Sequence, residues 1–143
     1  MNKISLFFIL VLFNSCVSTT QFTKFSELEK PPSEMLAKIC VVRPSIIASA
    51  IQMSVYCDEN LIGKTGPKGY LSWEVQEGEH IVRTHAENKD YFNIYAKAGK
   101  TYYIKQSPKM GWLYSRVSLK EMQEKDGKTT VSKLKKPTLN FAE

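Results

Sequence analysis

Histidine is scarce in this chain of 143 residues, which contains only two, and cysteine is little more frequent, with three. A protein zinc site usually takes three or four ligands. His80 and His85 are an odd number of positions apart, so on a strand their side chains point to opposite faces. No C-x-x-C motif or other metal-ligand spacing is present. The sequence therefore predicts no metal site.

Long apolar runs are also missing. The apolar run at residues 4–13 has about ten residues, whereas a membrane-spanning helix needs about 18–20. Lys3 precedes this run, and the small residue Ser15 follows it. A positive start, a short apolar stretch and a small residue before the cut are the parts of a secretory signal peptide. We therefore predict a cleaved signal peptide at residues 1–15, with a buried N-terminal helix as the alternative.

The end of this segment, Leu-Phe-Asn-Ser-Cys at residues 12–16, resembles the lipobox of bacterial lipoproteins, although Phe13 stands where leucine is usual. The resemblance implies that the Cys16 thiol receives a diacylglyceryl group and becomes the acylated N-terminus. Val17 is not the aspartate that tends to retain such proteins in the inner membrane. The implied location is the bacterial cell envelope, on the outer membrane facing the periplasm if the host is Gram-negative. A conventional signal with a chance cysteine is the alternative.

Catalytic motifs are absent as well. No nucleophile elbow appears, and no Gly-Lys-Ser/Thr follows the glycines at 66 and 69 to make a phosphate loop. Asp58, Glu59 and Asn60 lack the spacing of a calcium loop and are better explained as a hairpin tip. We predict no catalytic residue and no cofactor, and hence a protein that is not an enzyme.

What the chain does have is a basic balance, with a formal net charge of +6. An exported protein does not meet nucleic acid, so the acidic neighbours to expect are anionic lipid headgroups or envelope polysaccharide. A solvated basic surface is the simpler alternative. Residues 128–136 hold four lysines and no acid, and form either a short helix or a loose, solubilising tail.

Short runs of β-forming residues, with Gly, Pro, Asn or Asp between them, fill the middle of the chain. Period-two alternation of this kind favours antiparallel strands. About seven or eight such runs without a long amphipathic helix favour an all-β fold, an antiparallel β-sandwich or small barrel. The expected strands are residues 37–43, 51–57, 61–64, 70–75, 79–86, 91–96, 101–107 and 117–122.

The predicted organisation is a signal peptide (1–15), a lipidated cysteine and tether (16–36), a β-sandwich domain (37–127) and a basic C-terminal tail (128–143). Cys40 lies within one expected strand and Cys57 ends the next. They form a disulfide only if their Cα atoms face each other at about 4.4–6.8 Å. Otherwise they are two small buried hydrophobic residues.

Four segments carry a family resemblance: AKICVVRPS, MSVYCDENLIG, GYLSWEVQEGEHIV and AGKTYYIKQSPKMGW. Together they resemble a family of small bacterial lipoproteins whose β-domain has no assigned function. Glu59 and Asn60 replace the glycine region usual in the family's hairpin, and Glu77 stands where proline is common. The chain is more loosely similar to PEGA-type β-sandwich domains. Neither resemblance implies a reaction.

Aromatic residues gather in the last third of the chain, and alternation predicts that some rings are buried and others exposed. If Tyr102 points inward, Tyr103 points outward. Trp112 follows Pro108 in an expected loop, and Arg43 stands at a strand end. Exposed Tyr, Trp and Arg are typical anchors for a partner. Arg43, Tyr103 and Trp112 are therefore the candidate partner-binding residues, with ordinary packing as the alternative for each.

Three functions are compatible with these patterns. The leading one is a membrane-anchored, non-enzymatic envelope lipoprotein that binds an envelope protein or polysaccharide. The second is a hydrolase or transferase acting on cell-wall material, which requires a cleft with a perturbed acid or base. The third is a carrier with a dry internal cavity for an apolar ligand. A β-sandwich hosts many functions, so the fold does not choose among them.

Overall fold

The computed structural model of this chain describes residues 30–110 and 115–134. All eight strands expected from the alternation are present, and their ends differ from the expected ones by a few residues. One helix follows them. The elements in chain order are β1 (Leu36–Arg43), β2 (Met53–Cys57), β3 (Asn60–Thr65), β4 (Gly69–Gln76), β5 (Gly78–His85), β6 (Lys89–Ala96), β7 (Thr101–Met110), β8 (Ser115–Met122) and α1 (Glu124–Ser132).

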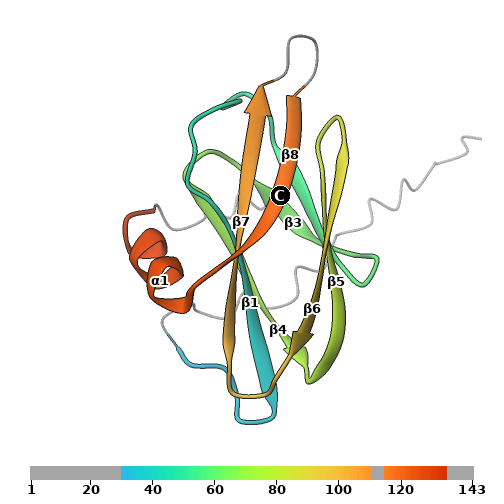
Figure 1. Ribbon diagram of the computed structural model, residues 1–143, viewed down its shortest axis with the longest axis vertical. Helices are drawn as coiled ribbons and strands as arrows, with labels where there is room; N and C mark the ends of the chain where they lie inside the picture. Colours follow the sequence, from blue (N-terminus) through green and yellow to red (C-terminus); the bar gives the residue numbers. More distant parts are fainter. Residues whose placement is uncertain (1–29, 111–114, 135–143) are drawn as a thin grey trace, which may run out of the picture.

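The strands form two packed sheets of four, with the orders β4-β1-β7-β8 and β3-β2-β5-β6 (Figure 1). The predicted β-sandwich is confirmed. Every strand pair is antiparallel except β1 with β7, which run parallel. Side-chain alternation is the same in both kinds of pair, so the sequence pattern does not reveal this exception.

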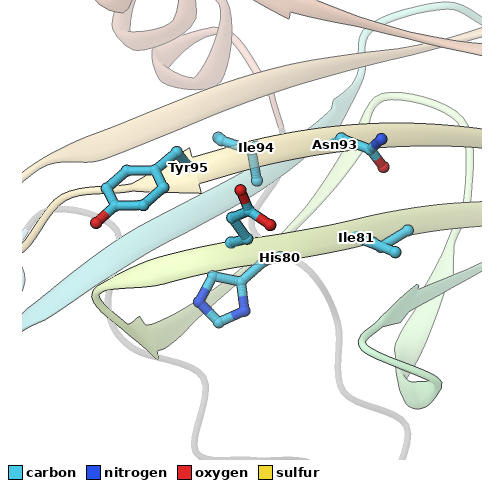
Figure 2. Close-up of a pocket in the computed structure, with 6 residues that line it drawn as sticks. His80, Ile81, Asn93, Ile94 and Tyr95 are labelled. Carbon is cyan, nitrogen blue, oxygen red and sulfur yellow. The ribbon is translucent and has the colours of Figure 1, made fainter.

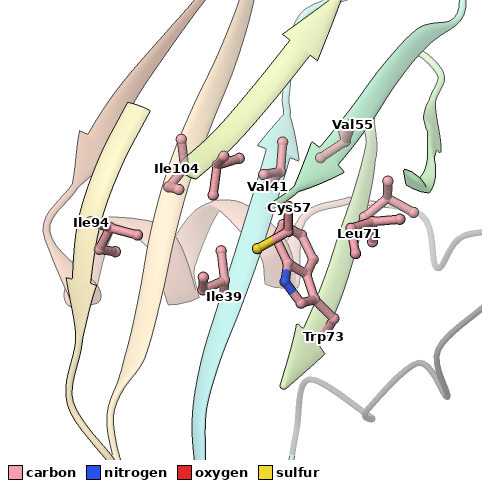
Figure 3. Close-up of a cluster of buried hydrophobic side chains, with 10 residues drawn as sticks. Ile39, Val41, Val55, Cys57, Leu71, Trp73, Ile94 and Ile104 are labelled. Carbon is pink, nitrogen blue, oxygen red and sulfur yellow. The ribbon is translucent and has the colours of Figure 1, made fainter. Parts of the chain in front are cut away.

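The core lies between the two sheets. Alternate residues of both sheets point into it, which is why the hydrophobic positions recur with a period of two. Figure 3 shows the sulfur of Cys57 beside the indole of Trp73 within this cluster. The buried members are Ile39, Val41, Val55, Cys57, Ile62, Leu71, Trp73, Val82, Ile94 and Ile104. These side chains occupy the space in which an apolar ligand carrier would need a dry cavity.

Strand β1 is buried on both faces, which explains why its sequence is almost continuously apolar. Ile39 and Val41 face the other sheet, whereas Cys40 and Val42 face outward. Cys57 lies in the core between the two sheets, whereas Cys40 lies on the outward face of β1. Both are free thiols. The disulfide left open by the sequence does not form.

Helix α1 covers this outward face of β1 and β7 (Figure 1). Val131 and Leu134 pack against Cys40, Val42 and Tyr103. The helix begins at Glu124 and crosses the predicted boundary between domain and tail at residues 127 and 128. Its residues are thus part of the packed domain. Over residues 30–110 and 115–134, no helix combines the length and apolar character that crossing a bilayer requires.

Two side chains, one just before β6 and one near its start, close the open edge of β8. Asn88 accepts a hydrogen bond from the Val117 amide at 2.7 Å and donates to the Val117 carbonyl at 3.1 Å. Asp90 accepts from the Leu119 amide at 2.7 Å. These bonds fasten one sheet to the other and satisfy backbone groups that would otherwise invite pairing with another chain.

Candidate functional site

The outer surface of β5 and β6 carries the exposed large hydrophobic side chains of the described strands. Glu79 pairs with Tyr95 and Ile81 with Asn93 across the two strands, so these four side chains share one face. Tyr91 lies on the same face, four positions before Tyr95. Ile81, Tyr91 and Tyr95 are 49%, 54% and 55% exposed. We call these five residues the β5–β6 face.

A depression of about 260 Å³ opens on this part of the sheet. Figure 2 shows Tyr95, Asn93 and Ile81 along the two strands, and His80 turned away from Tyr95. Among the described residues, the side chains of Glu79 and Asn93 make no hydrogen bond or ion pair. The depression therefore combines an aromatic ring and an aliphatic side chain with a free carboxylate and a free amide. Its lining residues are Glu79, His80, Ile81, Asn93, Ile94 and Tyr95.

Arg83 holds a fixed position next to the β5–β6 face. Its guanidinium carbon lies 4.1 Å from the centroid of the Tyr56 ring, and one of its nitrogens lies 3.4 Å from the Glu59 carboxylate. The register places Tyr56, Arg83 and Tyr91 in one row across β2, β5 and β6. Contact with the ring of Tyr56 limits the motion of Arg83, so Tyr56 and Arg83 border the face beside Tyr91.

A second group of polar side chains lies where β2 ends and β5 begins. One ligand atom from each of Cys57, Asp58 and His80 lies within 4.8 Å of the other two. Asp58 Oδ2 is 2.5 Å from His80 Nδ1 and 3.8 Å from Cys57 Sγ. His80 Nε2 lies 2.8 Å from the carbonyl oxygen of Gln76. Of the described residues, these three are the set able to hold a metal.

The electrostatics of this group follow from these contacts. Burial alone lowers the pKa of His80, but the hydrogen bonds to Asp58 and to the Gln76 carbonyl outweigh it and raise that pKa. Burial raises the pKa of Asp58, and the bonds from His80 and the Ile81 amide reverse this and lower it. Burial raises the pKa of Cys57 to about 12. Without a metal, Cys57 is therefore a protonated thiol at neutral pH, which is a poor nucleophile.

Arg43, predicted as a partner-binding residue, lies inside the domain with 0% exposure. One terminal nitrogen donates to the carbonyls of Ile51 and Thr65, and the other donates to those of Ile47 and Ala48. The two terminal nitrogens thus hold the loop between β1 and β2 and the end of β3, so Arg43 is not available as the exposed anchor that the sequence predicted.

Tyr103 does point outward, opposite to Tyr102, as alternation predicts. It is nevertheless only 3% exposed, because α1 covers it. Arg43 shares the inward face of β1 with Val41, so the sheet separates it from Tyr103. The structure does not bring Arg43 and Tyr103 together. Cys16 and Trp112, the other predicted site residues, lie outside the described residues.

Neither Ile81 nor Tyr95 was among the residues expected to bind a partner. A signal for them exists, since Ile81 alternates with the buried Val82, and Tyr91 and Tyr95 are two full periods apart on one strand. No such local signal exists for Cys57, Asp58 and His80. Their meeting depends on the register between β2 and β5, which pairs Cys57 with Val82.

The sequence of this chain matches a known protein family. Residues 33–118 match the family described as "Protein of unknown function (DUF2846)". The chain is also 31% identical over 107 residues to an "Uncharacterized protein" of Haemophilus influenzae. That alignment covers 73% of this chain and 63% of the relative, so the chain spans less than two thirds of the relative's length.

Proposed function

The chain belongs to this family of unknown function, and we propose a role for it. We propose that it is a lipid-anchored, non-enzymatic binding module of the bacterial cell envelope. In this proposal Cys16 carries the lipid and residues 16–36 tether the β-sandwich to the membrane. The β5–β6 face binds an envelope component, either a protein or a polysaccharide.

The exposure of Ile81, Tyr91 and Tyr95 on regular strands supports the binding role. Tyrosine is favoured at interfaces because its ring is apolar, its hydroxyl forms hydrogen bonds, and few torsions are frozen on binding. The face is also pre-organised, since it belongs to two paired strands and Arg83 borders it. Less ordering entropy is then lost when a partner binds.

The chemistry of the described residues favours binding over catalysis. A cysteine nucleophile requires a thiolate and a base within hydrogen-bond reach. Cys57 is buried and protonated, and both ring nitrogens of His80 already face acceptors. The part of the chain that the structure describes therefore contains no activated cysteine–histidine pair at this position.

The test is crosslinking in intact cells, which compares the native chain with a variant carrying Tyr91→Ala and Tyr95→Ala. We expect the crosslinked species formed by the native chain to disappear in the double variant, and co-sedimentation with isolated cell wall to disappear if the partner is polysaccharide. Ile46→Ser is the matched control, because Ile46 is also strongly exposed but lies in the loop after β1. Equal capture by the native chain and the double variant would contradict the proposal.

A further inference from the structure

The group formed by Cys57, Asp58 and His80 indicates a role that is separate from partner binding. We infer that these three side chains form a binding site for a zinc ion, which ties the β2–β3 hairpin to β5. The inference does not depend on the β5–β6 face or on the lipid anchor.

The donor types fit zinc. A thiolate, an imidazole and a carboxylate are the ligands that Zn²⁺ takes in proteins, at about 2.3, 2.0–2.1 and 2.0–2.2 Å. Tetrahedral coordination at those lengths separates the donor atoms by about 3.3–3.6 Å. Asp58 Oδ2 lies 3.8 Å from Cys57 Sγ and 2.5 Å from His80 Nδ1. The ion therefore requires the carboxylate and the imidazole to separate by about 1 Å, with Zn²⁺ replacing the hydrogen bond between them.

The surroundings of His80 prepare it to be a ligand. Histidines that bind metals usually donate the second ring N–H to a carbonyl or carboxylate, which fixes the tautomer. The Gln76 carbonyl lies 2.8 Å from His80 Nε2 and accepts such a bond. Neutral His80 with its proton on Nε2 then presents the lone pair of Nδ1 to the ion.

Asp58 is held in a similar way. Its Oδ1 accepts a hydrogen bond from the Ile81 amide at 2.9 Å, which leaves Oδ2 directed at His80 and Cys57. The side chain of Asp58 is 44% exposed, whereas Cys57 is 5% exposed. An ion enters from the side of Asp58, and its fourth coordination position faces solvent. Binding releases to water the thiol proton of Cys57 and the proton that His80 Nδ1 shares with Asp58, and the thiolate and the carboxylate then balance the charge of the ion.

The chain offers matched controls for each kind of ligand. Cys40 is a second buried thiol, but it lies beneath α1 on the other sheet, and His85 is at the opposite end of β5. Cys40→Ser and His85→Gln therefore repeat the chemical changes of Cys57→Ser and His80→Gln at positions far from the site.

The experiment uses the full native chain, purified and stripped of metal with EDTA. It is titrated with Zn²⁺ by calorimetry and with Co²⁺ by absorption spectroscopy. We expect one ion per chain and a thiolate-to-Co²⁺ charge-transfer band. Cys57→Ser should abolish the band, and Asp58→Asn and His80→Gln should weaken Zn²⁺ binding at least about tenfold. The control variants should behave like the native chain.

Two outcomes would overturn the inference. One is the absence of a charge-transfer band in the native chain. The other is a band that persists in Cys57→Ser or disappears in Cys40→Ser. If Cys57→Ser does not fold, Zn²⁺ binding by Asp58→Asn is the test instead, because Asp58 is more exposed than Cys57. Saturating Zn²⁺ should raise the melting temperature of the native chain, because an ion that binds only the folded state stabilises it. An equal rise in Asp58→Asn would contradict the site.

Discussion

At the scale of single residues, Arg43 shows how a polar side chain is kept inside this domain. It meets no carboxylate among the described residues, and backbone carbonyls from the loop and from β3 surround its charge instead. A buried charge without such partners is strongly destabilising. The fork of the guanidinium matches two pairs of carbonyls, which the single ammonium of lysine does not do.

Arg43→Lys should therefore lower the free energy of unfolding by about 1–3 kcal/mol, since several charge-assisted hydrogen bonds are lost and carbonyls remain unsatisfied. Denaturant titration of the purified chain measures this change. Arg116→Lys is the control, because Arg116 is exposed on β8, and its effect should stay within about 0.5 kcal/mol. Equal midpoints for the two variants would mean that the carbonyl bonds of Arg43 contribute little.

At the scale of elements, α1 depends on one glycine. Gly127 is the buried residue of the helix and lies directly against the side chain of Tyr103, so that a Cβ at this position would overlap the ring. The helix is otherwise polar and short. Its docking, more than its intrinsic propensity, must account for its presence.

Gly127→Ala tests this dependence, because docking and helix propensity predict opposite changes in stability for this substitution. In an exposed helix the change stabilises by about 1 kcal/mol. Here it should undock α1 and destabilise the domain, because Tyr103 must move. Cys40, whose pKa burial holds far above its usual range, should then react faster with a maleimide. Mass spectrometry of the modified peptide measures the rate.

Lys125→Ala is the control for this variant, since Lys125 is exposed on the same helix. In the Lys125→Ala variant, Cys40 should react with the maleimide as slowly as it does in the native chain. A Gly127→Ala chain with native stability and an unreactive Cys40 would show that the ring of Tyr103 adapts without loss of the helix.

The elements also show what was predictable from sequence. Strands such as β2 and β4 were recognisable because one face is buried and every second residue is apolar. Helix α1 was only one of two alternatives for residues 128–136, since its sequence EKDGKTTVS has a central glycine and few apolar residues. The orientation of Tyr103 followed from alternation, but its burial depends on that helix. Alternation marks the exposed residues of β5 and β6 one strand at a time, but their meeting in the β5–β6 face, like that of the Cys57–Asp58–His80 group, required strand register, which no local pattern encodes.

At the scale of the whole molecule, the proposal combines a β-sandwich with a lipid anchor and a tether. The β5–β6 face and the zinc site lie on the sheet opposite to the one that α1 covers (Figure 1). The tether at residues 16–36 has about twenty residues, which reach at most about 70 Å when extended. In the proposal, that length allows the β5–β6 face to reach an envelope partner while the chain stays anchored.

In the proposal, the lipid anchor depends on one atom, the sulfur of Cys16. Each methylene placed in the bilayer contributes about 0.8 kcal/mol, and two or more acyl chains hold a protein stably where one does not. Cys16→Ala removes the sulfur that would carry them. We expect this variant to lose metabolic labelling by fatty acid and to leave the membrane fraction. Cys40→Ala and Cys57→Ala should retain the label, because both thiols are buried in the folded domain. Labelling that persists in Cys16→Ala, or a native protein that retains residues 1–15 without added lipid mass, would contradict the anchor and leave the β-sandwich without its proposed place in the envelope.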